Sequence, residues 1–407
     1  MADVPAGGPT LPLDGITVLD CSRVLAGPHA TMLLADLGAD VWKLEPPFGD
    51  ETRGWGPPFW GDPGDGRSAY FAAVNRNKRS LVVDLKTDAG QELLDRLAAR
   101  ADLLVHNYVP SVASRLGLAA DRLRKRHPHL VVTAISGFPG TGMLAERPAY
   151  DLVAQAWSGH MAVTGAPGGD PVKFGVGLLD LLAGLEAGVA ALAGLAARER
   201  GHRHPDAVRT GVPPASVSLV EAAVAGLTNV LGYHLATGEE PRRWGTGHPD
   251  IVPYQVFAAR DGHLVVAVGN DVQFARLCAV LGVDPEAAWS TNPGRVQRRA
   301  EVLAALAPRI AEWRRDELLA ALTAADVPSG PVHSVGEAVA AMRRIDPDWI
   351  TSVDGVQVPA SPIRVDDARL PIRRPPPRLG EHTDEILGQI GLNRAEIAAL
   401  RSEGVVA

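Results

Sequence analysis

Residues Ile16 to Glu45 read ITVLDCSRVLAGPHATMLLADLGADVWKLE, and this segment contains the clearest sign of tertiary structure in the chain. Ile16 to Ser22 and Asp40 to Glu45 have the residue types of strands, whereas residues 27–38 have the apolar spacing of a helix. A strand, a helix and a second strand in succession form a βαβ unit. The segment therefore predicts the start of a parallel sheet.

The same alternation continues toward the C-terminus. Strands are expected at 80–85, 102–107 and 130–136, and helices at 87–100 and near 119–125. Successive βαβ units predict an α/β domain with a Rossmann-like parallel sheet and helices on its faces. Neither a GxGxxG motif after the first strand nor a Gly-Lys-Ser/Thr loop is present, so the sequence does not support dinucleotide or P-loop nucleotide chemistry.

Composition shifts predict where this domain ends. Residues 1–200 are assigned to the large domain, and residues 201–216, rich in Pro, Gly and His, to a linker. Residues 217–325 are expected to form a smaller α+β domain, with a hairpin in YQVFAARDGHLVVAVG (254–269). The closing stretch 358–391 is Pro-rich and is expected to be extended before a final pair of helices.

Composition and charge are those of an enzyme with substantial cores. The 407 residues are 46% hydrophobic and 21% charged, with a net charge of −7 and no Lys/Arg-rich block. Nucleic acid and acidic membrane surfaces are therefore poor candidates as partners. Residues 174–197 are long enough to span a membrane, but they contain Asp180 and Glu186 and are expected to form a core helix.

The cysteines and histidines predict neither a disulfide nor a metal site. Cys21 and Cys278 lie far apart without ligand spacing, which indicates free thiols in a reducing compartment. The N-terminus has no basic region followed by an apolar one, so a cytoplasmic location is expected. His202 and His204 form an H-x-H pair without a third ligand, and no metal is expected.

Asp180 is a single carboxylate at the start of an apolar, glycine-rich stretch. Residues 181–197 are almost all Leu, Ala, Val and Gly, which predicts a buried helix that begins close to Asp180. The dipole and free N–H groups of that helix would favour the ionised, nucleophilic carboxylate. The alternative is an N-cap aspartate that only satisfies backbone donors.

Six ordered motifs cover nearly the whole chain: residues 13–53, NRNKRSLVVDLKTDAG (75–90), ISGFPGTG (135–142), RPAYDLVAQAWSG (147–159), VPSGPVHSVGEA (327–338) and GEHTDEIL (380–387). With these motifs the chain resembles the family III CoA-transferases, which include formyl-CoA and carnitine CoA-transferases and, as relatives, the 2-methylacyl-CoA racemases. The resemblance implies that residues 326–407 return to the large domain. It also implies that two ring-like subunits interlock into a homodimer.

The resemblance implies transfer of CoA from an acyl-CoA to a carboxylic acid, with no metal and no permanently bound cofactor. Asp180 matches the nucleophile, whose carboxylate attacks the thioester and later bears CoA as an aspartyl thioester. Positions that contact CoA in the family match Asp84, Leu85, Lys86, Asn107, Tyr108, Arg115, Arg147 and Tyr150. Phosphate-binding cations and backbone donors are expected at such a site.

A glycine loop closes over the site in this family. Its match here is WGTGHPD, with Gly245, Gly247 and His248, and the alternative is a plain turn between helices. Leu25 stands where the formyl-CoA enzyme has Gln, which favours an acid larger or more apolar than formate or oxalate.

Tyr150 and Asp151 separate the two activities of the superfamily. Racemases use a His directly before an Asp that lies 29 positions ahead of the second catalytic Asp; here Asp151 has that spacing to Asp180, but Tyr150 precedes it. A phenol is a poor base near neutral pH, so transfer is favoured over racemisation. Asp151 is expected to position the substrate or the closing loop, or else to cap a helix.

Two alternatives to the transferase stay open at this point. One is an acyl-CoA racemase or epimerase that uses another residue as its base. The other is a non-catalytic CoA-binding or scaffold protein, because Val109 and Ser216 depart from residues common in the family.

Overall fold

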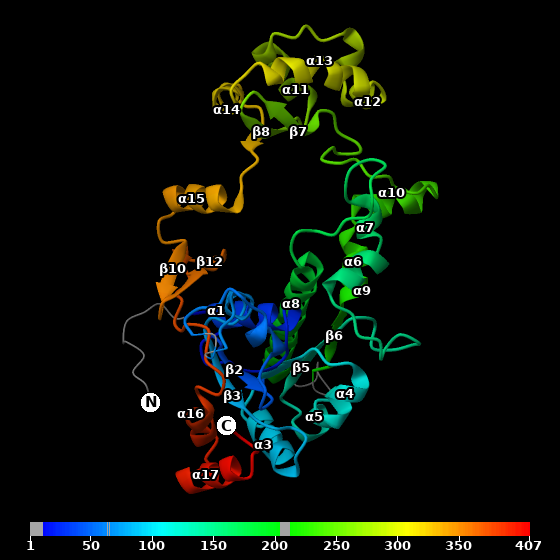
Figure 1. Cartoon of the computed structure of the whole chain (residues 1–407). Helices are drawn as coiled ribbons and strands as arrows, with labels where there is room; N and C mark the ends of the chain where they lie inside the picture. The colour runs from blue at the N-terminus through cyan, green and yellow to red at the C-terminus, as the bar shows by residue number, and fades with distance from the viewer. Residues whose placement is uncertain (1–10, 63, 65, 204–211) are drawn as a thin grey trace. The chain divides into compact units, whose positions relative to one another are not determined.

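The structure is a computed structural model that describes residues 11–62, 64, 66–203 and 212–407. The chain folds into two compact units, each with its own core (Figure 1). The large unit contains the chain up to His160, Lys173–Thr237 and Asp348–Ala407. The small unit contains Met161–Val172 and Gly238–Pro347.

A six-stranded parallel sheet forms the centre of the large unit. Its strands are β1 (Thr17–Cys21), β2 (Asp40–Glu45), β3 (Lys78–Val82), β4 (Leu103–His106), β5 (Val131–Ser136) and β6 (Ala215–Ser218). The spatial order is β3-β2-β1-β4-β5-β6, and every neighbouring pair is parallel. This is the strand order of a doubly wound Rossmann sheet, so the predicted Rossmann-like layout is confirmed.

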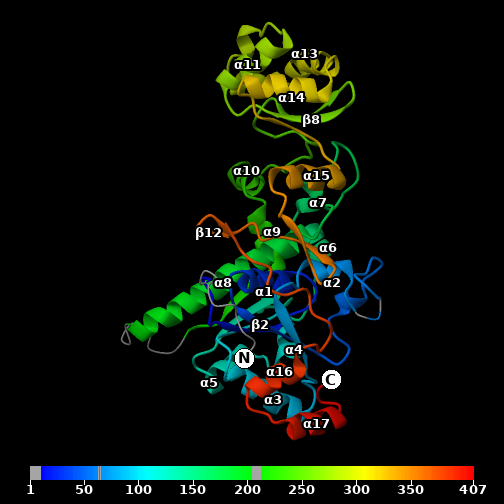
Figure 2. The ribbon, with the colours of Figure 1, turned by 90° about the vertical axis from the view of Figure 1, so that its left-hand side faces the viewer.

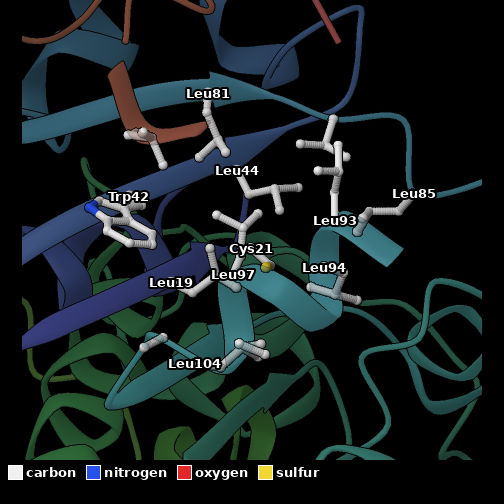
Figure 3. Packing of buried hydrophobic residues seen from close by; sticks show 14 of the residues in the cluster. Leu19, Cys21, Trp42, Leu44, Leu81, Leu85, Leu93, Leu94, Leu97 and Leu104 are labelled. Carbon is white, nitrogen blue, oxygen red and sulfur yellow. The ribbon is translucent and has the colours of Figure 1, made fainter. Parts of the chain in front are cut away.

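Alternate residues of the strands build one core on each face of the sheet. Leu19, Trp42 and Leu104 face α3 (Asp88–Ala98), α5 (Ala120–Arg126), α16 (Thr383–Gln389) and α17 (Arg394–Ser402); Figure 3 shows part of this cluster. Val18, Val41 and Val105 face α1 (Ala26–Asp36), α6 (Asp151–Trp157), α8 (Leu178–Arg203) and α9 (Leu219–Gly226). Figure 2 shows α1 and α8 together on this second face.

The C-terminal segment belongs to the large unit. The N–H of Gly380 donates to Ser80 Oγ at 2.9 Å, and the N–H of His382 donates to the Ser80 carbonyl at 2.9 Å. Residues near the C-terminus thus lie against β3, far away in sequence.

The small unit has a core between a sheet and helices. β7 (Tyr254–Ala259) and β8 (Gly262–Ala267) form the predicted antiparallel hairpin, and β9 (Ser329–Pro331) pairs with β8. The sheet packs against α11 (Asp271–Leu281), α13 (Arg299–Ala311) and α14 (Arg315–Ala324).

The described residues also form further helices and two-stranded hairpins. They are η1 (Glu51–Gly54), α2 (Ala69–Ala73), α4 (Pro110–Arg115), α7 (His160–Val163), α10 (Asn229–Thr237), η4 (Ala287–Trp289), α12 (Asn292–Gln297), α15 (Val335–Ile345), and the hairpins β10 (Ile350–Val353) with β11 (Val356–Pro359) and β12 (Arg364–Val365) with β13 (Ala368–Arg369).

The unit boundaries differ from the predicted ones. β6, which includes Ser216 of the predicted linker, pairs with β5, and α9 packs against α8. The main segment of the small unit runs from Gly238 to Pro347 instead of from residue 217 to 325, and Met161–Val172, predicted within the large domain, also belongs to the small unit. Residues 204–211 of the predicted linker lie outside the described residues, and so do the side chains of the predicted H-x-H pair.

Helix α8 begins at Leu178, close to Asp180 as predicted. By length and apolar composition, Leu178–Gly201 could cross a membrane. One face of the helix, with Ala183 and Ala187, is buried against the sheet side of the unit, but Leu185 and Val189 on another face are exposed in the single chain. The predicted burial of this helix is therefore wrong for the face that carries Leu185 and Val189.

Candidate active site

Asp180 lies in the first turn of α8, with only 7% of its surface exposed. The free N–H groups at the start of this helix do not bind it. Asp151 Oδ1 accepts the N–H of Leu179 at 2.8 Å and the N–H of Asp180 at 3.4 Å. The predicted contact of the helix N–H groups with Asp180 is therefore wrong, because Asp180 lies inside the turn and Asp151 caps it.

Burial and the nearby negative charge of Asp151 raise the pKa of Asp180 to about 7. The prediction that the helix would favour the ionised form is therefore wrong. The protonated form of Asp180 is therefore favoured more than in an ordinary aspartate, and the carboxylate that forms is poorly solvated. A poorly solvated carboxylate with a high pKa is a stronger nucleophile than an ordinary aspartate.

Asp151 is held in place by the helix on which it lies. Gln155, one turn later on α6, donates from Nε2 to Asp151 Oδ2, and its Oε1 accepts the N–H of Phe174 at 2.8 Å. Both carboxylate oxygens of Asp151 are thus engaged. This favours the predicted capping role, although the helix that Asp151 caps is α8 and not its own.

Asp180 lines a pocket at the carboxyl edge of the sheet. The predicted residues Leu25, Asn107 and Tyr150 line the same pocket, as does Val109. Ligands of doubly wound sheets bind at this edge, beside the point where strand order reverses, here between β1 and β4. Four of the predicted site residues are thus brought together.

A second pocket, of about 590 Å³, contains five of the eight predicted CoA contacts: Asp84, Leu85, Lys86, Tyr108 and Arg115. Its volume falls in the usual range of small-molecule sites. Arg23 lines this pocket and also the pocket of Asp180, so the two adjoin at its side chain. Predicted residues that are scattered in the sequence are therefore collected into two neighbouring cavities.

Arg23 is a site residue that sequence reasoning missed. Its guanidinium lies 4.8 Å from the ring centre of Tyr108 and 3.4 Å from Glu51, and its Nε is buried without a partner. The available signal was its position: it follows the first strand directly, at the edge where doubly wound sheets bind ligands.

Three predicted CoA contacts have other partners in the structure. Arg147 lines neither pocket, and its guanidinium lies 5.5 Å from the ring centre of Phe138. Asn107 accepts the N–H of Arg23 at 2.9 Å and donates to the Arg23 carbonyl at 2.6 Å. Tyr150 donates its hydroxyl to Glu51 at 3.4 Å, and the charge of Glu51 raises the pKa of Tyr150, so even less of this phenol is ionised near neutral pH.

The predicted closing loop belongs to the small unit. Gly245 has a φ of +64°, which suits glycine, and its N–H donates to the Gly165 carbonyl at 3.1 Å. Arg243 donates to the carbonyls of Met161 and Gly169, so the loop is fastened to the segment Met161–Val172. Gly247 and His248 follow in the same loop, and its closure over Asp180 stays a prediction.

The described part of the chain contains no group of three His, Cys, Asp or Glu side chains that could hold a metal ion. Cys21 and Cys278 are both free and buried.

Comparisons with known proteins identify the family of the chain. The family model described as CoA-transferase family III matches residues 13–383. Two relatives are 38% identical: a succinyl-CoA:glutarate CoA-transferase of Mus musculus, over 97% of this chain and 90% of the relative, and a succinate--glutarate CoA-transferase of Agrobacterium fabrum, over 96% and 98%. A formyl-CoA:oxalate CoA-transferase of Streptomyces avermitilis is 33% identical over 98% of this chain and all of the relative.

Solved structures show the same fold. The crystal structure of a CAIB/BAIF family protein from Brucella suis has a TM-score of 0.82 at 37% identity, covering 93% of this chain and 99% of that one. That of Rv3272 from M. tuberculosis has a TM-score of 0.81 at 29% identity, with the same coverage. The extent of these matches establishes that the chain belongs to CoA-transferase family III and is an enzyme of that family.

Proposed function

We propose that this CoA-transferase works through a covalent intermediate on Asp180. The Asp180 carboxylate attacks the thioester carbonyl, the C–S bond breaks, and a mixed anhydride and CoA thiolate form. The thiolate then attacks the aspartyl carbonyl and releases the donor acid. The acceptor carboxylate attacks the carbonyl of the resulting aspartyl thioester and displaces CoA thiolate, which leaves a mixed anhydride of Asp180 and the acceptor. The thiolate then attacks the acceptor carbonyl, forms the new acyl-CoA and restores the Asp180 carboxylate.

The observation that carries this proposal is the position of Asp180. It is a nearly buried carboxylate with a raised pKa, and it opens onto a pocket that adjoins the cavity of the predicted CoA contacts. Asp151 is the only other carboxylate that contacts this turn of α8 among the hydrogen bonds of the described residues, and both of its oxygens are occupied. Asp180 is therefore the better nucleophile.

We assign the second pocket to the nucleotide part of CoA. Lys86 and Arg115 line it and supply positive charge for phosphates, and Arg23 supplies a third cation toward Asp180. This arrangement would lead the pantetheine arm from the second pocket past Arg23 to Asp180. CoA then enters each turnover as the donor acyl-CoA and leaves as the new acyl-CoA, and no cofactor stays bound.

We propose short dicarboxylic acids as donor and acceptor. The relatives at 38% identity are named for succinate and glutarate, and Arg23 places a cation in the pocket of Asp180 that could pair with a second carboxylate. The predicted preference for an acid larger than formate or oxalate agrees with this choice, since Leu25 lines the same pocket.

We also propose a homodimer. Leu185 and Val189, one turn apart on α8, and Trp157 of α6 are exposed in the single chain, and contiguous exposed apolar patches mark protein–protein interfaces. The interlocked arrangement rests on the family resemblance. A cytoplasmic location is in line with the free thiols of Cys21 and Cys278.

The test uses the intact protein with a panel of acyl-CoA thioesters that includes succinyl-, glutaryl-, acetyl- and formyl-CoA. After hydroxylamine treatment, peptide mass spectrometry should find a hydroxamate at Asp180 only when a thioester was present, and none in Asp180→Ala. The adduct-forming thioester names the donor.

CoA binding without an adduct would argue against the covalent mechanism. Deuterium uptake from solvent at the α-carbon of a branched acyl-CoA would then identify a racemase, and binding without either reaction would identify a scaffold.

A further inference from the structure

The turn from Ser22 to Leu25, between β1 and α1, is one wall of the pocket that contains Asp180. Val24 in this turn has a φ of +69°. A β-branched residue rarely adopts this left-handed conformation, which costs on the order of 1–3 kcal/mol. The surroundings of the turn must therefore impose it.

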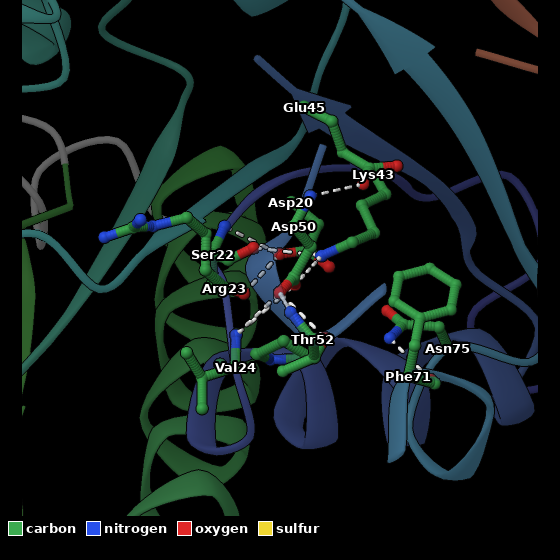
Figure 4. Close-up of polar contacts among 12 residues, drawn as sticks. Asp20, Ser22, Arg23, Val24, Lys43, Glu45, Asp50, Thr52, Phe71 and Asn75 are labelled. Carbon is green, nitrogen blue, oxygen red and sulfur yellow. Dashed lines mark hydrogen bonds and ion pairs between the residues drawn. The ribbon is translucent and has the colours of Figure 1, made fainter. Parts of the chain in front are cut away.

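A buried ion pair binds the backbone of this turn (Figure 4). Lys43 Nζ lies 3.0 Å from Asp50 Oδ2, both side chains are fully buried, and Nζ also donates to the Ser22 carbonyl at 3.0 Å. The two oxygens of Asp50 accept the N–H of Val24 at 3.3 and 3.4 Å. Thr52 orients Asp50 by donating its N–H and its hydroxyl to Oδ1, at 3.0 and 2.8 Å.

The residue between these two anchor points is held from another strand. Asn107, which follows β4, binds both the N–H and the carbonyl of Arg23. Three successive residues of the turn are thus fixed by side chains from distant parts of the chain. A turn that needed only to connect β1 with α1 would not require so many buried polar partners.

The turn also contacts the helix that carries Asp180. A Cβ added at Gly177, just before α8, would lie 2.9 Å from Leu25 Cδ2 and 3.8 Å from Asp180 Oδ2. A Cβ added at Gly184 would lie 2.6 Å from the Ala26 carbonyl oxygen. Because this contact has no free space, a shift of the turn moves the pocket wall against Asp180.

We propose that Asp50 and Lys43 are positioning residues for CoA transfer: the pair holds Val24 in its left-handed conformation, so that Leu25 fixes the acyl group against Asp180. This inference rests on the proposed function. A buried ion pair is by itself a weak source of stability compared with apolar side chains of similar volume. Control of the pocket wall gives the pair a role in catalysis.

The decisive experiment is a double-mutant cycle of Asp50→Asn and Val24→Gly, with kcat and KM for acyl-CoA measured for each variant. Asp50→Asn should lower kcat by about tenfold through loss of alignment, with KM little changed. Glycine adopts a positive φ without strain, so Val24→Gly in the Asp50→Asn background should restore most of the loss. A double mutant as slow as Asp50→Asn, or an Asp50→Asn variant as fast as the wild type, would overturn the inference.

A gentler variant covers the case in which Asp50→Asn does not fold. Thr52→Val removes one hydroxyl that orients Asp50 and should lower kcat by a few fold, and Thr52→Ser should restore it. Unchanged kcat in Thr52→Val would count against the inference.

The matched control is Asp36→Asn. Its carboxylate pairs with Arg76 at 2.5 Å, equally buried, and does not contact the turn. It should lower thermal stability and leave the kcat of the folded enzyme unchanged.

Hydrogen exchange keeps this inference separate from the proposed function. The amides of residues 22–27 should exchange faster in Asp50→Asn than in the wild type, and Asp36→Asn should not have this effect. If the wild type transfers CoA but glycine rescues nothing, the positioning role fails and the proposed function stands. If the wild type transfers no CoA with any thioester, the proposed function and the catalytic role both fail, and exchange alone decides whether the pair holds the turn.

Discussion

Two regions of the large unit bury carboxylates with opposite consequences. Under the turn after β1, burial alone would raise the pKa of Asp20, but Lys78 and Lys43 outweigh it and lower that pKa to about 2. At the start of α8, burial raises the pKa of Asp180 and Asp151 adds to the rise, to about 7. The two carboxyl groups differ in their charged neighbours. A nearby cation lowers the pKa of a buried carboxyl group and keeps it ionised, whereas a nearby carboxylate raises that pKa further.

The largest effect is expected from the reactive carboxylate. Asp180→Asn keeps the shape of the side chain and removes the nucleophile, so transfer should fall by about 10³-fold or more while the thermal unfolding temperature does not fall. Initial rates and calorimetry measure the two quantities. A variant that keeps a tenth of the activity would show that Asp180 is not the nucleophile.

The structural carboxylate should give the opposite result. Lys78 Nζ, fully buried, lies 2.9 Å from Asp20 Oδ2, so Lys78→Met leaves a buried anion with one cation fewer. The free energy of unfolding should fall by about 3–5 kcal/mol in urea denaturation. A loss below about 1 kcal/mol would mean that Lys43 alone compensates Asp20.

The pH dependence of stability sharpens the contrast. From pH 3.8 to about 7, Asp180 is ionised in the unfolded chain but still protonated in the folded one, so its contribution to stability falls as the pH rises. Asp180→Asn should therefore gain on the wild type by up to about 4 kcal/mol across this window. Asp20 contributes in the other direction, and its stabilisation should be lost as the pH falls below 3.8 toward 2. Denaturation series at pH 4, 5.5 and 7 compare Asp180→Asn with the wild type, and parallel curves would contradict the raised pKa of Asp180. For Asp20, the wild-type series is extended from pH 4 to pH 2.

The smallest effect is expected at Asp151. Asp151→Asn removes the negative charge but keeps an oxygen that can accept the N–H of Leu179. The acidic limb of the pH–rate profile should move to lower pH, with less than about a tenfold change in the plateau rate. A limb that does not move would indicate that burial alone raises the pKa of Asp180.

The sequence predicts what is local in this fold and misses what is distant. Five strands and the start of α8 follow from short runs of apolar residues. The strand β6 was missed because ASVS is only four residues long and has a single large apolar side chain. The exposed face of α8 was missed because its apolar residues surround the helix, and such a helix predicts complete burial.

For the site as well, residues within motifs were predicted and contacts between distant elements were missed. Asp180 and the expected CoA contacts come from motifs, and the structure collects Asp180 and seven of the eight expected contacts into adjoining pockets. The cap that Asp151 provides for α8, and the bonds of Asp50 to Val24, join residues 28 and 26 positions apart. No periodicity encodes such pairs, since they depend on how separate elements meet.

The membership of Met161–Val172 in the small unit has a consequence for protein engineering. A fragment limited to residues 238–347 would lack the carbonyls to which Arg243 and Gly245 donate. It would therefore leave a guanidinium and an amide of the glycine loop without their partners. Chimaeras that exchange this unit between family members must take two separate pieces of chain, and in the sequence the shorter piece falls between Asp151 and Asp180.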